Sequence, residues 1–207
     1  MTSKSEKQRR KALFANVTKL TREEQEAATR AEEAREKMLR DEELAYQASL
    51  MSNKSALLYG KIIGILESYA NFVSETNAAH TFLFEVVAKP DSLEEALKTY
   101  YENWEQEDAP YLLEEIANPK EALHEKLESW LFPYPNDPSR RRNYMFDLPE
   151  DRHSYLVEIV EFMFQVAKPA RVWKVDLRPI GWYECAWDDF VLESDKLIFV
   201  LHLGVSD

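Results

Sequence analysis

The sequence predicts a predominantly helical α+β protein with a long N-terminal helix, a helical body and a C-terminal antiparallel sheet of three strands. Residues 171–205 form the only long segment with the alternation and the β-branched and aromatic content typical of strands. Most of the preceding segments carry apolar residues at intervals of three and four, which is the helical pattern. The helices are therefore expected to cover the sheet.

The first two predicted strands flank a short turn. Apolar and charged residues alternate over 173–177, as in a half-buried strand, and the Pro-Ile-Gly sequence at 179–181 breaks the run. The next run, 182–192, is rich in aromatic residues but contains Asp188 and Asp189. This interruption predicts a bulge or a bend in the second strand.

The third predicted strand lies at 197–203, after a turn at 193–196. It is apolar on both faces except for His202. A strand with two apolar faces is typical of the interior of a sheet. We therefore expect this strand to have a neighbour on each side.

The first part of the chain differs from the rest in charge. The net charge is −12, yet residues 1–55 carry a balance of +2 and residues 56–207 a balance of −14. We divide the chain into a basic tail at 1–20, a charged helical arm at 21–54 and an acidic α+β domain at 55–207. The acidic domain disfavours nucleic-acid binding, whereas the basic tail leaves such binding open for the N-terminus.

The helical arm begins at Thr21, which forms a capping-box pattern with Glu24. Alanines recur along one face of this helix and give a narrow stripe that buries little apolar area. The helix therefore needs a neighbour, which is the body of the same chain, another copy of the chain or a partner protein. A homo-oligomer formed through this helix is one of these alternatives.

The most apolar helix is predicted at 56–73, and its interior charges argue against a membrane span. We expect it to be the central helix of the core. Gly60 and Gly64 lie four residues apart in it, a spacing that predicts close packing against a neighbouring element of the chain, with a dimer interface as the alternative. The apolar run at 81–87 continues the core, either as a helix or as a short strand.

Four further helices are predicted in the body. They lie at 91–108, at 110–117 and at 119–131, and the last begins at Pro149 and ends before Pro169. A proline suits the first turn of a helix, which supports three of these starts. The last helix has a broad apolar face and is expected to pack on the sheet.

Residues 91–128 carry twelve acidic residues and only three lysines. They form either a solvated surface or a docking face for a basic partner. A proline-rich loop at 132–143 contains three consecutive arginines, which either pair with carboxylates of the body or present a binding loop. The residues predicted to bind a partner are Glu102, Glu105, Glu107, Asp108, Glu114, Glu115, Arg140, Arg141 and Arg142.

Few sequence patterns indicate chemistry. The four glycines lack the spacing of a phosphate-binding loop, there is no Gly-x-Ser-x-Gly elbow, and the four histidines are far apart in the sequence. Neither a cofactor nor a metal is expected. If the last two strands pair as a hairpin, Glu184, Asp188 and His202 share one face and form the best candidate acid–base group.

Cys185 is the only cysteine, so an intramolecular disulfide is excluded and a reducing compartment is indicated. Because it lies on a predicted strand, we expect a buried structural thiol in preference to a nucleophile. The protein is expected to be cytoplasmic and to lack a membrane span.

These observations favour a non-enzymatic, acidic protein-interaction module. An inhibitor, an antitoxin or an immunity-type protein would fit, because its carboxylates could occupy sites where a basic partner binds phosphates. One alternative is a small enzyme or ligand-binding domain that uses the face with Glu184, Asp188 and His202. Another is a structural protein that assembles through the helix at 21–52.

Overall fold

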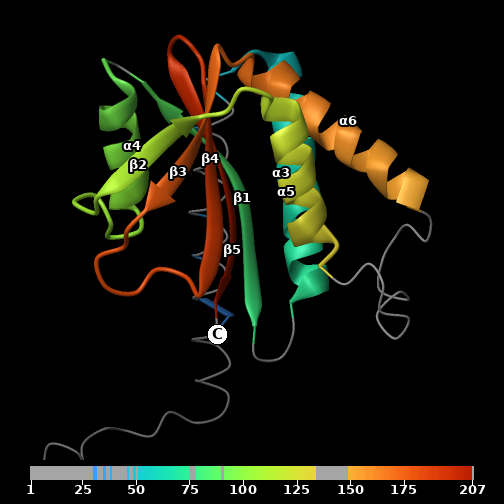
Figure 1. Ribbon diagram of the computed structural model, residues 1–207, viewed down its shortest axis with the longest axis horizontal. Coiled ribbons are helices and arrows are strands. Elements are labelled where there is room, and N and C mark those ends of the chain that lie inside the picture. Colours follow the sequence, from blue (N-terminus) through green and yellow to red (C-terminus); the bar gives the residue numbers. More distant parts are fainter. Residues whose placement is uncertain are drawn as a thin grey trace, which may run out of the picture. The chain divides into compact units, whose positions relative to one another are not determined.

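A computed structural model describes residues 30–31, 35, 38, 46, 49, 51–74, 78–89, 91–133 and 149–206 (Figure 1). Residues 1–45 and 46–207 form two compact units, and the account below concerns the second. Within the predicted arm, residues 30, 31, 35, 38, 46 and 49 are helical, and most of its other residues lie outside the described ranges. The elements in chain order are α3 (Asn53–Val73), β1 (Ala79–Ala88), α4 (Leu93–Glu102), β2 (Tyr111–Glu115), α5 (Pro119–Leu131), α6 (Pro149–Ala167), β3 (Arg171–Leu177), β4 (Ala186–Glu193) and β5 (Leu197–Ser206).

The sheet has five antiparallel strands in the order β1-β5-β4-β3-β2, so the prediction of a three-stranded C-terminal sheet is wrong. One added strand is β1, in the run that was left open between helix and strand. The other is β2, in the segment 110–117 that was predicted as a helix. Leucine and glutamate favour helices locally, but pairing of this short segment with β3 overrides that preference.

β5 lies inside the sheet, as its two apolar faces predicted. It pairs along its whole length with β1 on one side, and β4 pairs with it on the other side from Ala186 to Glu193. Both pairings keep a regular register, and β4 also pairs regularly with β3. The bulge or bend predicted at Asp188 and Asp189 therefore does not form.

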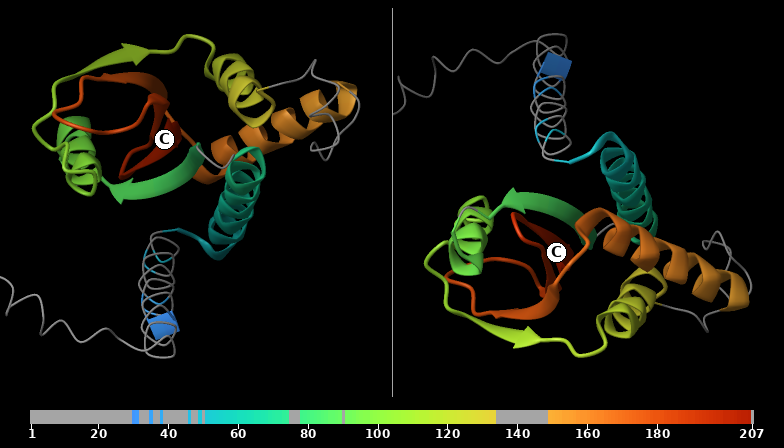
Figure 2. Two further views of the ribbon diagram at one scale, coloured as in Figure 1. Left: turned by 90° about the horizontal axis from the view of Figure 1, so that it is seen from below. Right: turned by 90° about the horizontal axis from the view of Figure 1, so that it is seen from above.

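Helices cover both faces of the sheet, which gives three layers (Figures 1 and 2). α4 covers one face, and its core partners on the sheet include Val175, Val191 and Val200. Helices α3, α5 and α6 cover the other face, where Phe84 and Phe199 stack with their ring centroids 5.5 Å apart. Successive residues of each strand thus enter different cores, as the pleat requires.

Three helices begin where local chemistry favours a start. In α4, the Ser92 side chain accepts a hydrogen bond from the backbone amide of Glu95, and this helix is shorter than the predicted 91–108. The helix predicted at 119–131 is α5, which has proline at its first position. α6 begins at Pro149 and ends at Ala167, before Pro169.

Gly60 and Gly64 do not serve the close packing that their spacing predicted. Both lie on the exposed side of α3, and a Cβ atom added at either position would meet nothing within 4 Å. The buried face of α3 instead presents larger side chains, including Ile62 and Leu66.

Candidate functional site

His202 lies on β5, on the face of the sheet that α4 covers, and its side chain is fully buried. Its nearest polar partner is Asp189, which is directly opposite on β4. The Nδ1 atom of His202 is 2.7 Å from Oδ1 of Asp189, and neither side chain is exposed to solvent. The adjacent inner strands β4 and β5 are therefore joined by a buried, charge-assisted contact.

Sequence reasoning placed Asp188 beside His202, but the structure places Asp189 there. The hairpin between β4 and β5 turns at residues 195–196, so even-numbered residues on one strand pair with odd-numbered residues on the other. With no bulge to change this parity, Asp188 faces the opposite core. Its Oδ2 atom is 3.0 Å from both Lys126 Nζ and Trp130 Nε1 of α5.

Glu184 and His202 do come together, as predicted. Glu184 precedes β4, and its Oε1 atom is 3.7 Å from Nε2 of His202, with only 3% of the side chain exposed. The loop that carries Glu184 is held by Gln106, whose side chain bonds to the backbone of Ile180 and Trp182. The polar contacts of Gln106 thus position Glu184 over the histidine.

Gly204 provides the space for this contact. It lies two residues after His202 and points to the same face of β5. A Cβ atom at this position would be 2.6 Å from Nε2 of His202 and 2.9 Å from Cδ of Glu184. Only glycine leaves both side chains where they are.

Aromatic side chains complete the cluster and were missed by sequence reasoning. Tyr101 of α4 donates a hydrogen bond from its hydroxyl to Asp189 Oδ2 at 2.9 Å. The hydroxyl of Tyr183 is 3.3 Å from the same oxygen and 3.3 Å from His202 Nδ1. The Trp104 ring lies beside the imidazole, with the ring centroids 5.0 Å apart.

The cluster holds a proton on His202. Burial by itself would lower the pKa of this imidazole, but the hydrogen bond with Asp189 and the negative charges of Asp189 and Glu184 outweigh burial and raise it to about 9. Burial, together with the charge of Asp189, raises the pKa of Tyr101 and Tyr183. These shifts favour a protonated His202 and neutral Tyr101 and Tyr183 at neutral pH.

This arrangement suits a structural role better than acid–base catalysis. A general acid or base must be within hydrogen-bond reach of its substrate, directly or through one water. His202 and Asp189 are both fully buried, and Trp104 and Tyr183 pack against the imidazole ring. Solvent therefore does not reach the imidazole of His202 or the carboxylate of Asp189.

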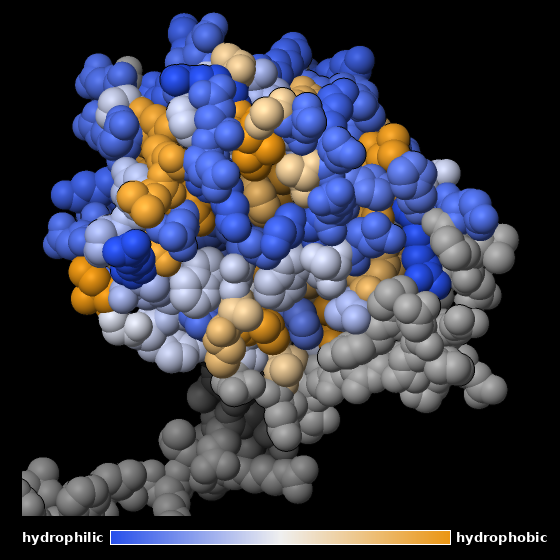
Figure 3. Space-filling view, in the orientation of Figure 1, coloured by the Kyte–Doolittle hydropathy of each residue, from blue (hydrophilic) through white to orange (hydrophobic). Residues whose placement is uncertain are grey.

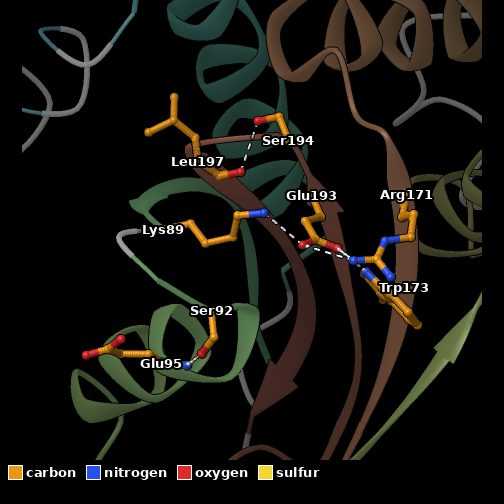
Figure 4. Close-up of polar contacts among 8 residues, drawn as sticks. All are labelled: Lys89, Ser92, Glu95, Arg171, Trp173, Glu193, Ser194 and Leu197. Carbon is orange, nitrogen blue, oxygen red and sulfur yellow. Dashed lines mark hydrogen bonds and ion pairs between the residues drawn. The ribbon is translucent and has the colours of Figure 1, made fainter.

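A second buried carboxylate, Glu193, ties three parts of the fold together at the end of β4 (Figure 4). Lys89 approaches it from one side at 2.8 Å, and Arg171 and Trp173 approach from the other at 3.1 and 2.9 Å. These hydrogen bonds and charges overcome the effect of burial and lower the pKa of Glu193. This residue was predicted to be part of a turn, and no local sequence pattern revealed its partners.

Two histidines meet in a hollow between α5 and α6. The rings of His124 and His153 have their centroids 4.6 Å apart, and the hollow has a volume of about 360 Å³. Among the residues that the structure describes, no three His, Cys, Asp or Glu side chains are placed to hold a metal ion. The residues that line the hollow are Lys120, Glu121, His124, Glu125, His153, Val157, Val160 and Glu161.

The residues predicted to bind a partner divide into two groups. The acidic ones lie at the end of α4, in the following loop and on β2, and all of them are exposed: Glu102, Glu105, Glu107, Asp108, Glu114 and Glu115. We call this set the acidic surface. Arg140, Arg141 and Arg142 lie outside the described residues.

Cys185 differs from its prediction as a buried thiol. It is exposed, and it lies just before the start of β4, not on the strand itself. Its backbone amide donates a hydrogen bond to the carbonyl of Val205. The backbone of this residue is therefore fixed although its side chain reaches solvent.

Comparison of the chain with protein-family models, with curated proteins and with solved structures finds no match. In the described part of the chain, every helix is too short or too polar to cross a membrane.

The glycine that makes room for the buried cluster can be tested directly. We expect Gly204→Ala to lower the free energy of unfolding by about 1–3 kcal/mol, because the added methyl group must displace His202 or Glu184. The matched control is Gly64→Ala on the exposed side of α3, which should raise stability by about 0.5–1 kcal/mol. Urea unfolding of both variants measures the difference; equal effects would contradict the close approach at Gly204.

The raised pKa of His202 predicts that stability falls in mildly alkaline solution. Below pH 6.5 the folded and unfolded chains both bind this proton, so its contribution is complete. Between pH 6.5 and about 9 only the folded state keeps the proton, and the free energy of unfolding should fall by about 3 kcal/mol.

Urea unfolding at several pH values checks this prediction. Asp189→Asn should weaken the dependence on pH, because it removes the charge that holds the proton on His202. Asp188→Asn is the matched control, since this neighbour bonds to α5 on the other face and should leave the dependence in place. If the free energy of unfolding depends on pH in the same way in the wild type and in both variants, the proton on His202 is not the cause of that dependence.

Proposed function

We propose that this protein is a non-enzymatic binding module whose acidic surface engages a basic protein partner. The observation that carries the proposal is the lack of internal partners for these carboxylates. No residue in the described ranges forms an ion pair with any of the six. They are exposed, negative and uncompensated, which favours association with a cationic surface.

Two of the three lysines of the segment 91–128 pair with carboxylates outside that segment. Lys120 pairs with Glu161 of α6 at 2.6 Å, and Lys126 pairs with Asp188 of β4 at 3.0 Å. Both cations thus neutralise carboxylates outside the segment 91–128. Hydrophilic side chains cover much of the molecule in the view of Figure 3, with apolar residues exposed between them.

An inhibitor, an antitoxin or an immunity-type protein is the class that this design fits best. Carboxylates on such a protein can occupy the phosphate-binding surface of an enzyme that acts on nucleic acid. The cytoplasmic location inferred from the single cysteine belongs to the same proposal. The basic N-terminal tail keeps its predicted capacity for nucleic acid, and the helix at 21–52 its predicted capacity for self-assembly.

The alternative of an enzyme or ligand-binding domain has weaker support. It requires Glu184, Asp188 and His202 on one accessible face. His202 is fully buried, and Asp188 bonds to Lys126 on the opposite face. The acidic surface has no such obstacle, since all its members reach solvent.

A pull-down from lysate of the source cells tests the proposal. The wild type should retain a basic protein that is released as salt rises, because screening weakens exposed charge pairs. A variant with the six members of the acidic surface changed to Gln or Asn should lose at least tenfold in bound partner.

The matched control neutralises as many exposed acidic residues elsewhere. These are Glu121, Glu125, Glu128, Glu150, Asp151 and Asp195. The change in net charge is the same, so a general effect of charge would reduce binding equally in both variants. Equal loss, or retention by the first variant, would overturn the proposal that this surface is the binding site.

A further inference from the structure

β2 forms one end of the sheet, and no described strand pairs with its outer edge. Its inner edge is fixed by two backbone contacts: Ile116 donates to the carbonyl of Val172, and Arg178 donates to the carbonyl of Pro110. In an antiparallel pair, alternate residues point their backbone groups to the same side. The backbone groups of Tyr111, Leu113 and Glu115 therefore point away from the sheet.

The side chains on β2 combine apolar and acidic character. Leu112 is 58% exposed, and Glu114 and Glu115 are exposed as well. Across from Glu114 on β3 lies Lys174, and across from Leu112 lies Asp176. The edge thus offers unpaired backbone groups, one uncovered leucine and an excess of negative charge.

The opposite edge of the sheet differs. β1 is ten residues long and its apolar side chains are buried on alternate positions. α3 and α4 both contact it, and Glu85 is its only charged residue. Negative charge therefore distinguishes the β2 edge from the β1 edge.

The charges on β2 determine which strand can pair with it. Two copies of this chain that paired through β2 would bring the Glu114 and Glu115 side chains of both copies into one short two-stranded ladder, and this accumulation of like charge opposes association. A strand with Lys or Arg side chains would meet attraction at the same positions. The edge is therefore protected against self-association and remains open to a basic strand.

We propose that an extended, lysine- or arginine-rich segment of a partner adds to the sheet as a sixth strand along the outer edge of β2. This inference rests on the proposed function, since it states how the acidic surface engages its basic partner. Backbone hydrogen bonds to Tyr111, Leu113 and Glu115 supply affinity that depends little on the side chains of the partner segment. The carboxylates on β2 favour a segment with positive charge.

A fluorescently labelled peptide of eight residues, with lysine and valine in alternation, serves as the probe. Fluorescence anisotropy with the full chain should show binding that weakens as salt rises. The same peptide with N-methyl groups on alternate residues keeps the charges but loses hydrogen-bond donors. It should bind at least tenfold more weakly, because several backbone hydrogen bonds are lost together.

A pair of variants tests the backbone hydrogen bonds of the outer edge of β2 from the side of the protein. Glu115→Gln removes one charge but keeps the outward N–H, and should weaken binding of the parent peptide about twofold. Glu115→Pro also removes that N–H, at an edge position where proline is tolerated, and should weaken binding about fivefold further. Circular dichroism verifies that both variants are folded.

The outcomes separate this inference from the proposed function. Equal binding of the parent and the N-methylated peptide overturns strand addition, and so does the absence of any binding. If the two peptides bind equally well, but their affinity falls as salt rises and on neutralisation of the acidic surface, the proposed function stands without strand addition. Binding that responds to neither salt nor neutralisation overturns both.

Discussion

The buried ion pair between Asp189 and His202 is the contact around which the sheet is ordered. Removing either partner would leave a buried charge without its counter-charge, which is strongly destabilising. The pair also fixes the register. A slip of one residue between β4 and β5 would turn Asp189 to the other face of the sheet and leave the imidazole without its carboxylate. Glu184 and the two tyrosines fit around the pair only in the observed alignment.

The sequence carried enough information for α3, α5, α6 and the three C-terminal strands, but not for the whole sheet. β5 was recognised because a strand with neighbours on both sides is apolar on both faces. β2 was taken for a helix because its Leu and Glu residues favour helices, and only the pairing with β3 makes it a strand. In the site, Glu184 and His202 were found, whereas Asp189 was not. Even-numbered residues of both strands were expected to share a face, whereas the hairpin pairs odd-numbered residues of β4 with even-numbered residues of β5. Tyr101 comes from a helix that no local pattern could place above His202.

Carboxylates of this protein have two distinct uses. Those on β4 are paired with cationic side chains: Asp188 with Lys126, Asp189 with His202, and Glu193 with Lys89 and Arg171. Those of the acidic surface have no such partners in the described residues. The paired carboxylates help to hold neighbouring elements together, and the unpaired ones make the surface negatively charged. The net charge of −12 is thus largely a property of the surface.

Cys185 lies directly after Glu184, is exposed, and is the only sulfhydryl in the chain. Its backbone is hydrogen-bonded to β5, while its side chain is free to react with a maleimide or a methanethiosulfonate. A spin label or a dye can therefore be attached at one defined position without removing any other cysteine. Such a label would report on the local environment of the segment that carries Glu184, one residue from the buried cluster.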